Sequence, residues 1–147
     1  MGTDIHVKTE AYNKETGKWE KLYLYSYDNL LNGGLREVDA YSTRNYELFS
    51  ILAGVRGNAI PIDSCRNIPK DVSNGVINDL DNDGKYCHSF TWYALNELKE
   101  AAEDKKCYTK RQRRALKRFI FGVEFVAEAN WYFGDDSNIR VIIYFDS

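Results

Sequence analysis

The chain contains two histidines, and each lies among polar neighbours where an imidazole could take part in chemistry. His6 alternates with Asp4 and Glu10 on one side of an N-terminal segment, so a carboxylate on the same strand face could orient its ring. His88 stands just before a predicted helix that includes Trp92, and the free N–H groups at a helix start favour anions. Both histidines are therefore candidates for acid–base work on a phosphate ester, and a structural role for each is the alternative.

Four arginines add a second kind of chemistry. Arg44 and Arg56 flank a predicted helix, Arg66 follows in an irregular stretch, and Arg140 lies on the last predicted strand. Guanidinium groups bind phosphate through paired hydrogen bonds, and the bases of nucleotides stack on aromatic rings. Because the chain has eleven Tyr, seven Phe and three Trp, the pattern suits a nucleotide pocket. Surface or ion-paired arginines are the alternative.

A metal centre is not expected from the sequence. The run Asp79–Gly84 resembles the first half of a calcium-binding EF-hand loop, but position twelve falls on Phe90 where a glutamate is required. An acidic turn explains the run better. Cys65, Cys87 and Cys107 fit no zinc-binding spacing, and no dinucleotide or phosphate-loop motif is present. We therefore expect neither a metal ligand set nor a cofactor.

Strands are predicted at both ends of the chain. Residues 4–12 alternate between apolar and polar types, residues 13–18 supply turn chemistry, and residues 19–27 form a second strand, so the chain should begin with a hairpin. Residues 28–41 show little periodicity and indicate a loop at a functional rim. Residues 138–146 alternate again and should form the final strand.

Helices are predicted between these strands. The apolar spacing indicates three: residues 45–55, 92–103 and 109–127. Ser42 or Thr43 could cap the first, which Gly54 is placed to end, and Thr91 and Thr109 could cap the others. A short helix over 71–79 is also expected, weakened by its glycine.

Together these elements predict an α+β fold with a mainly antiparallel sheet. The N-terminal hairpin and the C-terminal strand would form the sheet, and about three helices would cover one of its faces. The 147 residues are the size of one domain, so we expect a single domain over 1–147.

Charge and cysteine content narrow the class of partner. The formal net charge of −2 gives no overall field that would draw the protein to duplex nucleic acid. No stretch has the roughly twenty apolar residues of a membrane span. An odd number of cysteines and an N-terminus without a secretion signal indicate reduced thiols in a cytoplasm.

Three segments resemble a widespread family of small proteins encoded by phages and prophages: Met1–His6 (MGTDIH), Arg44–Arg56 (RNYELFSILAGVR) and Tyr144–Ser147 (YFDS). In that family the start reads MGCDIH, a segment like RNYDLFAILAGVR follows the hairpin, a His-Ser pair precedes the next helix, and the end reads like FWFDN. The resemblance spans the chain, and its first two motifs are specific. Thr3 replaces the usual cysteine, which argues against cysteine chemistry there, and residues 107–130 diverge. The resemblance implies a phage setting more firmly than an activity.

Compact phage proteins of similar size sequester nucleotide immune signals of the host in pockets lined by aromatics and arginines. By this analogy we expect a protein of the host cytoplasm that binds a cyclic ADP-ribose-type or cyclic oligonucleotide signal without cleaving it. The expected ligand-binding residues are Asp4, His6, Arg44, Asn45, Tyr46, Arg56, His88, Ser89 and Trp92.

Two other functions remain open at this point. One is a phosphodiesterase that uses His6 and His88 as general base and acid. The other is a direct inhibitor of a host defence enzyme, with exposed Tyr and Arg at its interface. Because a small domain offers limited depth for a large dianionic ligand, we also expect a homodimer that shares its pocket, with the loop 28–41 as interface or lid material.

Overall fold

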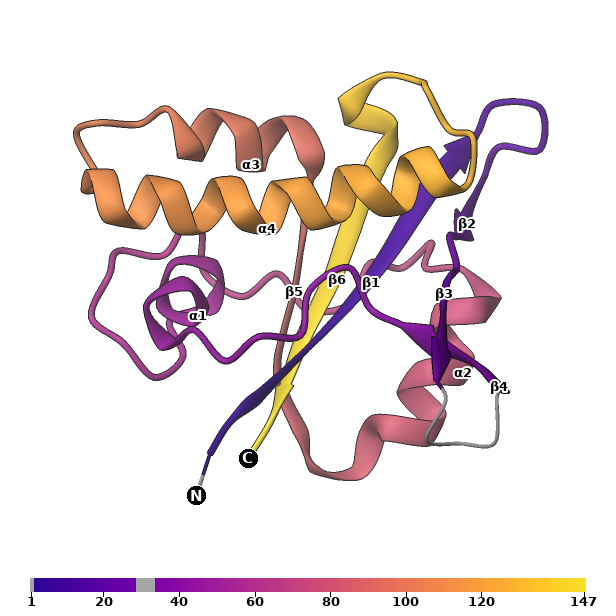
Figure 1. Ribbon diagram of the computed structural model, residues 1–147, viewed down its shortest axis with the longest axis horizontal. Helices are drawn as coiled ribbons and strands as arrows, with labels where there is room; N and C mark the ends of the chain where they lie inside the picture. The colour runs from indigo at the N-terminus through magenta and orange to yellow at the C-terminus, as the bar shows by residue number, and fades with distance from the viewer. Residues whose placement is uncertain (1, 29–33) are drawn as a thin grey trace.

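The computed structural model describes residues 2–28 and 34–147. Its centre is a four-stranded antiparallel sheet (Figure 1), in the order β2 (Lys18–Lys21), β1 (Asp4–Asn13), β6 (Ile139–Asp146) and β5 (Cys87–Ala94). The predicted N-terminal hairpin and the return of the last strand to the first are both confirmed.

Alternation along β1 gives the sheet two different faces. Ile5 and Val7 are buried on one face and pair with Phe145 and Ile143 of β6, whereas His6 and its alternate neighbours point to the other face. Directly opposed residues of antiparallel strands share a face, so the register carries the same division across the sheet. We call these the helix face and the polar face.

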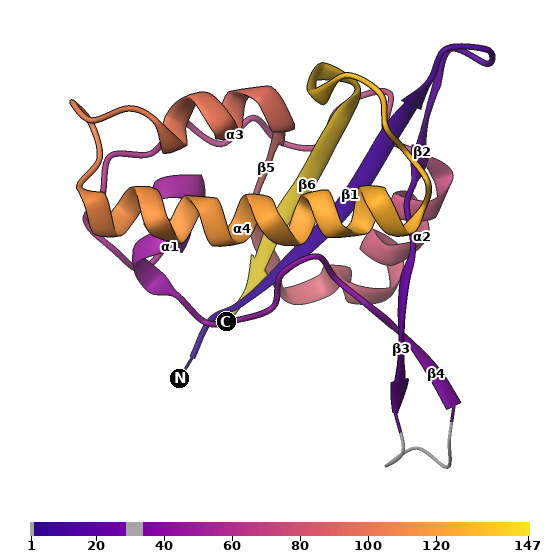
Figure 2. The ribbon, with the colours of Figure 1, turned by 45° about the horizontal axis from the view of Figure 1, so that its top comes forward.

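Three helices cover the helix face (Figures 1 and 2): α1 (Tyr46–Ala53), α3 (Leu95–Ala102) and α4 (Lys110–Ala129). Their apolar stripes meet the strands in one core, in which Phe49, Leu98 and Phe119 are fully buried. Gly54 ends α1 in the left-handed conformation (φ 69°), and Thr109 caps α4, as the sequence predicts. The α+β class with a helix-covered antiparallel sheet is therefore confirmed.

The polar face is covered in part by α2 (Asn74–Asp83) and the residues just before it. The hydroxyl of Tyr144 donates to Asp83 Oδ2 at 2.6 Å, and the backbone N–H of Ser73 donates to Glu10 Oε2 at 2.7 Å. The short helix thus lies a few residues later than the predicted 71–79, because Ser73 caps it. The 3₁₀ turn η2 (Gly84–Tyr86) then leads into β5.

The predicted strand 19–27 is interrupted, which corrects the sequence reading. It divides into β2 and β3 (Leu24–Asp28), and β3 leaves the central sheet to pair with β4 (Gly34–Val38) in a separate ribbon that extends from the body (Figure 2). Asp39 takes the place that a longer β2 would fill, since its carboxylate accepts from the N–H of Val7 at 3.1 Å and pairs with Lys8 at 2.8 Å.

The predicted loop 28–41 is likewise wrong in part, because it contains β4; its residues 29–33 lie outside the described residues. The predicted helix 92–103 also begins later, at Leu95. Thr91 does not cap it: Thr91 is buried within β5, and its hydroxyl accepts from the N–H of Arg66 at 3.2 Å. Pairing with β6 and burial of alternate side chains outweigh the local helical preference of this segment.

The cap of α1 differs from the prediction as well. Neither Ser42 nor Thr43 caps this helix; Asn45 does, by accepting from the N–H of Leu48 at 3.1 Å. The 3₁₀ turn η3 (Asp136–Asn138) precedes β6 at the other end of the chain.

Candidate functional site

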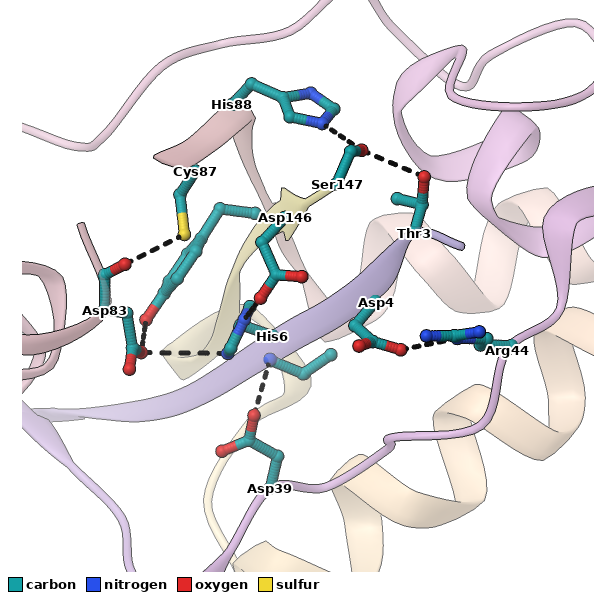
Figure 3. Close-up of polar contacts among 12 residues, drawn as sticks. Thr3, Asp4, His6, Asp39, Arg44, Asp83, Cys87, His88, Asp146 and Ser147 are labelled. Carbon is teal, nitrogen blue, oxygen red and sulfur yellow. Dashed lines mark hydrogen bonds and ion pairs between the residues drawn. The ribbon is translucent and has the colours of Figure 1, made fainter. Parts of the chain in front are cut away.

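Most of the predicted ligand-binding residues lie at one end of the central sheet, where β1 begins and β6 ends (Figure 3). Strand alternation sends their side chains to opposite faces. His88 pairs with Phe145 and shares the helix face, whereas His6 pairs with Tyr144 and shares the polar face. The single pocket expected from the sequence is therefore divided into two clusters, one on each face of the sheet.

The first, the helix-face cluster, is a chain of hydrogen bonds. It comprises Thr3, Tyr46, Arg56, His88, Ser89 and Ser147. Arg56 Nε donates to Thr3 Oγ1 at 2.8 Å, and that hydroxyl lies 2.9 Å from Ser147 Oγ. Ser147 Oγ lies 3.0 Å from His88 Nε2, while His88 Nδ1 lies 2.9 Å from Ser89 Oγ. Hydroxyl, imidazole and guanidinium groups thus stand in a continuous row, in which the buried Thr3 hydroxyl links groups that can donate to an anion.

Tyr46 forms the floor under part of this cluster. Its hydroxyl accepts from the N–H of Thr3 at 3.1 Å, and the Arg56 guanidinium lies over its ring at 5.6 Å from the centroid. Thr3 is fully buried, whereas Arg56 is exposed. The cationic end of the row therefore faces solvent.

Two residues of the helix-face cluster have left-handed backbones. Arg56 has φ 62° and Ser89 has φ 57°. The left-handed region costs a residue with a side chain on the order of 1–2 kcal/mol, and such strain is concentrated at functional sites. Ser89 lies where the pairing register between β5 and β6 shifts, between His88 and Thr91. This irregularity turns the side chains of His88 and Ser89 toward the end of the sheet.

The second, the polar-face cluster, surrounds His6 (Figure 3). It comprises His6, Asp83, Cys87, Tyr144 and Asp146. His6 Nε2 lies 2.6 Å from Asp146 Oδ2, and His6 Nδ1 lies 3.7 Å from Asp83 Oδ2. The imidazole stacks on the Tyr144 ring at 4.9 Å with an interplanar angle of 10°. Two carboxylates and one aromatic plane therefore determine the orientation of the ring.

The acidic environment of the polar-face cluster affects its neighbours. Burial raises the pKa of the Cys87 thiol, and the carboxylates of Asp146 and Asp83 raise it further. Burial, followed by the hydrogen bond to Asp83, also raises the pKa of the Tyr144 phenol. Both shifts favour the protonated forms of these two groups.

Asp4 and Arg44 form an ion pair at the start of β1. Arg44 Nε donates to Asp4 Oδ1 at 2.6 Å, and this hydrogen bond lowers the pKa of the Asp4 carboxyl. Both side chains are about half exposed, so the pair contributes little to stability. A ligand carboxylate or phosphate could displace Asp4 from the guanidinium at small cost.

Asn45 and Trp92, two of the predicted ligand-binding residues, lie outside both clusters and make structural contacts. The Asn45 side chain caps α1, as described above. Trp92 lies farther along β5 between two arginines, with the guanidinium of Arg66 at 5.0 Å and that of Arg140 at 5.7 Å from its ring. The structure thus does not bring Trp92 together with His6 or His88.

The remaining predicted arginines are ion-paired. Arg66 binds both carboxylate oxygens of Glu97, at 2.8 and 2.6 Å, and its Nε contacts Asp63 at 3.0 Å. Arg140 pairs with Glu10 at 2.7 Å inside the protein. The contacts of Arg66 and Arg140 are therefore those of ion-paired arginines and not those of a nucleotide pocket.

The acidic run Asp79–Gly84 is helical over most of its length, because α2 extends to Asp83. Its carboxylates therefore do not converge as those of a calcium-binding loop would. Asp79 pairs with Lys21, and Asp83 turns toward the polar-face cluster.

A broad cleft of about 900 Å³ lies apart from both clusters, between residues 60–66 and α3. Five carboxylates line it, against two cationic side chains, Arg66 and Lys99: Glu97, Glu100, Glu103, Asp104 and Asp136. A site with this charge would repel a phosphate, so the cleft does not suit the expected ligand.

Sequence reasoning did not identify Thr3, Asp83, Cys87, Asp146 or Ser147 as site residues. A signal existed for Asp146, since it alternates with Tyr144 on one face of the last strand, and antiparallel pairing would place that face beside His6. Cys87 gave no such signal, because its position depends on the pairing of β5 with β6.

Comparison of the chain with protein-family models, with curated proteins and with solved structures gave no match. The fold and the site are therefore interpreted from their own geometry. Within residues 2–28 and 34–147, none of the helices has the length and apolar character needed to cross a membrane.

Proposed function

We propose that this protein binds a phosphate-bearing nucleotide at the helix-face cluster and sequesters it without cleavage. The observation that supports the proposal most directly is the row of donors from Arg56 through Thr3 and Ser147 to His88 and Ser89. Phosphate oxygens accept several hydrogen bonds at once, and such a row can supply them from different segments.

Arg56, Tyr46 and Arg44 would each have a distinct part in binding. Arg56 would meet the phosphate as the exposed cation, and Tyr46 would offer a ring for the base or ribose in place of Trp92. Arg44 would add a second guanidinium once the ligand displaces Asp4. The left-handed backbones of Arg56 and Ser89 favour a binding role over a purely structural one.

Sequestration fits the geometry better than hydrolysis by the two histidines. A phosphodiesterase would need His6 and His88 on either side of one phosphate, but their rings lie on opposite faces of the sheet. The resemblance to phage-encoded proteins supplies the biological setting: we propose that the protein acts in the host cytoplasm against a cyclic ADP-ribose-type or cyclic oligonucleotide immune signal.

The test is calorimetric titration of the purified chain with panels of ADP-ribose-type and cyclic dinucleotide messengers. We expect saturable binding of one class, and recovery of intact ligand after heat denaturation. Arg56→Ala should weaken binding by about 2–4 kcal/mol, which is ~30- to ~1000-fold in Kd. Arg111→Ala is the matched control, because Arg111 is 86% exposed and pairs with Glu47.

Two results would reject the proposal. One is a lack of saturable binding across both panels, and the other is turnover of excess ligand, which would identify an enzyme. An Arg56→Ala effect no larger than that of Arg111→Ala would move the ligand away from the helix-face cluster.

We also propose that the protein is a homodimer. Large apolar side chains are exposed on the β3–β4 ribbon, along the second half of α4 and just beyond it: Tyr25, Tyr27, Leu35, Phe121, Phe125, Trp131 and Phe133. Exposed aromatics on this scale suit a protein interface. Light scattering should give twice the 17.0 kDa chain mass, and a monomer with and without ligand would refute the dimer.

A further inference from the structure

Three side chains of the polar-face cluster could bind one metal ion together. A ring nitrogen of His6, the sulfur of Cys87 and a carboxylate oxygen of Asp146 all lie within 4.8 Å of one another. They come from three neighbouring strands, β1, β5 and β6, at the same end of the sheet, where Cys87 and Asp146 are directly paired. Rigid strands therefore position all three ligands (Figure 3).

We propose that His6, Cys87 and Asp146 form a zinc site. The site is independent of the proposed nucleotide site, since the polar face and the helix face are opposite sides of the sheet. One thiolate, one imidazole and one carboxylate form a set typical of Zn²⁺, whereas Ca²⁺ and Mg²⁺ take oxygen ligands.

The geometry needs only small side-chain movements to bind the ion. Zinc bonds of about 2.0–2.3 Å at tetrahedral angles separate neighbouring ligand atoms by about 3.3–3.7 Å. The 2.6 Å contact between His6 Nε2 and Asp146 Oδ2 would open by less than about 1 Å, and the widest separations in the cluster, at most 4.8 Å, would close by about 1 Å. Rotations about the Asp146 and Cys87 side-chain bonds can produce both changes.

A second layer of contacts would hold the histidine ligand in place. With Nε2 on the metal, Nδ1 of His6 faces Asp83 Oδ2 at 3.7 Å, and a closer approach of roughly 0.7 Å would let it donate the hydrogen bond of the carboxylate–histidine–zinc arrangement. Tyr144 supports this arrangement twice, because its ring stacks on His6 and its hydroxyl donates to Asp83. Asp83 would thus orient the histidine without binding the metal, and the fourth tetrahedral position would be open to water or another ligand.

The cluster is accessible to an ion from solvent. The side chains of His6 and Asp146 are 22% and 39% exposed, so neither is sealed inside the protein. In the protein without metal, the hydrogen bond between them satisfies the imidazole, and Cys87 donates to the backbone oxygen of Asp83 at 3.5 Å. Zinc would replace these contacts with bonds to the metal, and the Cys87 thiol would release its proton to solvent as the Zn–S bond forms.

The experiment measures binding of Zn²⁺ alone to the full chain, stripped of metal and kept reduced, by competition with a chromophoric chelator. We expect about one equivalent bound with a Kd of about 1 µM or tighter. Cys87→Ser and His6→Asn should each weaken binding by at least about 100-fold, and Asp83→Asn by about 10- to 100-fold. Cys65→Ser is the matched control and should bind as the unmodified chain does, because Cys65 lies outside the cluster.

Cobalt substitution tests the ligands themselves. Co²⁺ in this site should show a sulfur-to-metal charge-transfer band, which Cys87→Ser removes and Cys65→Ser retains. Circular dichroism of the metal-free variants verifies that each is folded; if His6→Asn is not, the near-isosteric Cys87→Ser alone decides. The proposal is overturned if the chain binds no zinc, or if Cys87→Ser binds zinc as tightly as the unmodified chain. Nucleotide binding by Cys87→Ser should be unchanged, which separates this proposal from the previous one.

Discussion

The buried ion pair between Arg140 and Glu10 gives the sharpest prediction about stability. The two residues are directly paired between β6 and β1, and their side chains are only 4% and 0% exposed. Arg140 Nε contacts Glu10 Oε1 at 2.7 Å, Nη1 contacts Asp71 at 2.9 Å, and the guanidinium lies 4.0 Å from the centre of the Trp19 ring. Arg140→Met keeps much of the apolar stem but removes every one of these contacts.

The expected loss of stability follows from what remains. Glu10 would keep the hydrogen bond from Ser73 but lose its positive partner, and breaking a buried pair on one side costs about 3–5 kcal/mol. The lost contact with Trp19 adds roughly 0.5–2 kcal/mol. We therefore expect Arg140→Met to lose about 5 kcal/mol, which for a domain of this size lowers Tm by roughly 10–20 °C.

The assay is urea and thermal unfolding followed by circular dichroism, with a double-mutant cycle. In Arg140→Met/Glu10→Gln the remaining charge is gone, and the neutral amide can still accept from Ser73, so the double variant should be more stable than Arg140→Met by at least about 1 kcal/mol. The exposed Arg111→Ala should change stability by less than about 0.5 kcal/mol. The reasoning is refuted if Arg140→Met lies within about 1 kcal/mol of the unmodified chain, or if the two substitutions are simply additive.

Three further substitutions test other contacts. The Arg66 guanidinium lowers the pKa of Glu97, so its stabilisation is present above the ordinary glutamate pKa of 4.5 and is lost as pH falls through the lowered pKa. The difference in unfolding free energy between the unmodified chain and Glu97→Gln should thus shrink from pH 7 to about pH 3, and a constant difference would contradict this. Gly122→Ala should destabilise by about 1–3 kcal/mol in thermal unfolding despite alanine's higher helix propensity, because its methyl would clash with the carbonyl oxygen of Ala40; a stabilised variant would be inconsistent with this clash. Tyr93→Phe removes a buried 2.6 Å hydrogen bond to a backbone carbonyl of α1 and should cost about 1–2 kcal/mol in urea unfolding, whereas an unchanged midpoint would show that the bond contributes nothing.

Local patterns predicted those parts of the fold that local physics determines. The alternation of β1 sorts buried from half-buried residues between Asp4 and Thr9, and a one-residue error would reverse both faces. β6 is buried along its whole length except at Asp146. Gly54 and Thr109 were predictable because left-handed caps and side-chain caps need particular residue types.

The errors arose where tertiary contacts decide between two local possibilities. Residues 91–94 contain aromatic and apolar types that suit either a helix or a strand, and only the pairing with β6 selects the strand. The break after β2 depends on Asp39, a residue that reaches the edge of β1 from beyond β4. Neither contact produces a periodic pattern of residue types from which it could be predicted.

The two proposed sites follow from one geometric fact about the end of β6. Asp146 and Ser147 are adjacent in the chain, so alternation sends Asp146 to the polar face with His6 and Ser147 to the helix face with His88. The sequence prediction placed both histidines in one pocket because it brought the strand of His6 and a helix start at His88 together, without the strand register that separates their faces. A carboxylate between an imidazole and a thiol favours a cation, whereas a hydroxyl between an imidazole and a guanidinium favours an anion. Substitutions at Cys87 and at Arg56 should therefore affect zinc binding and nucleotide binding separately.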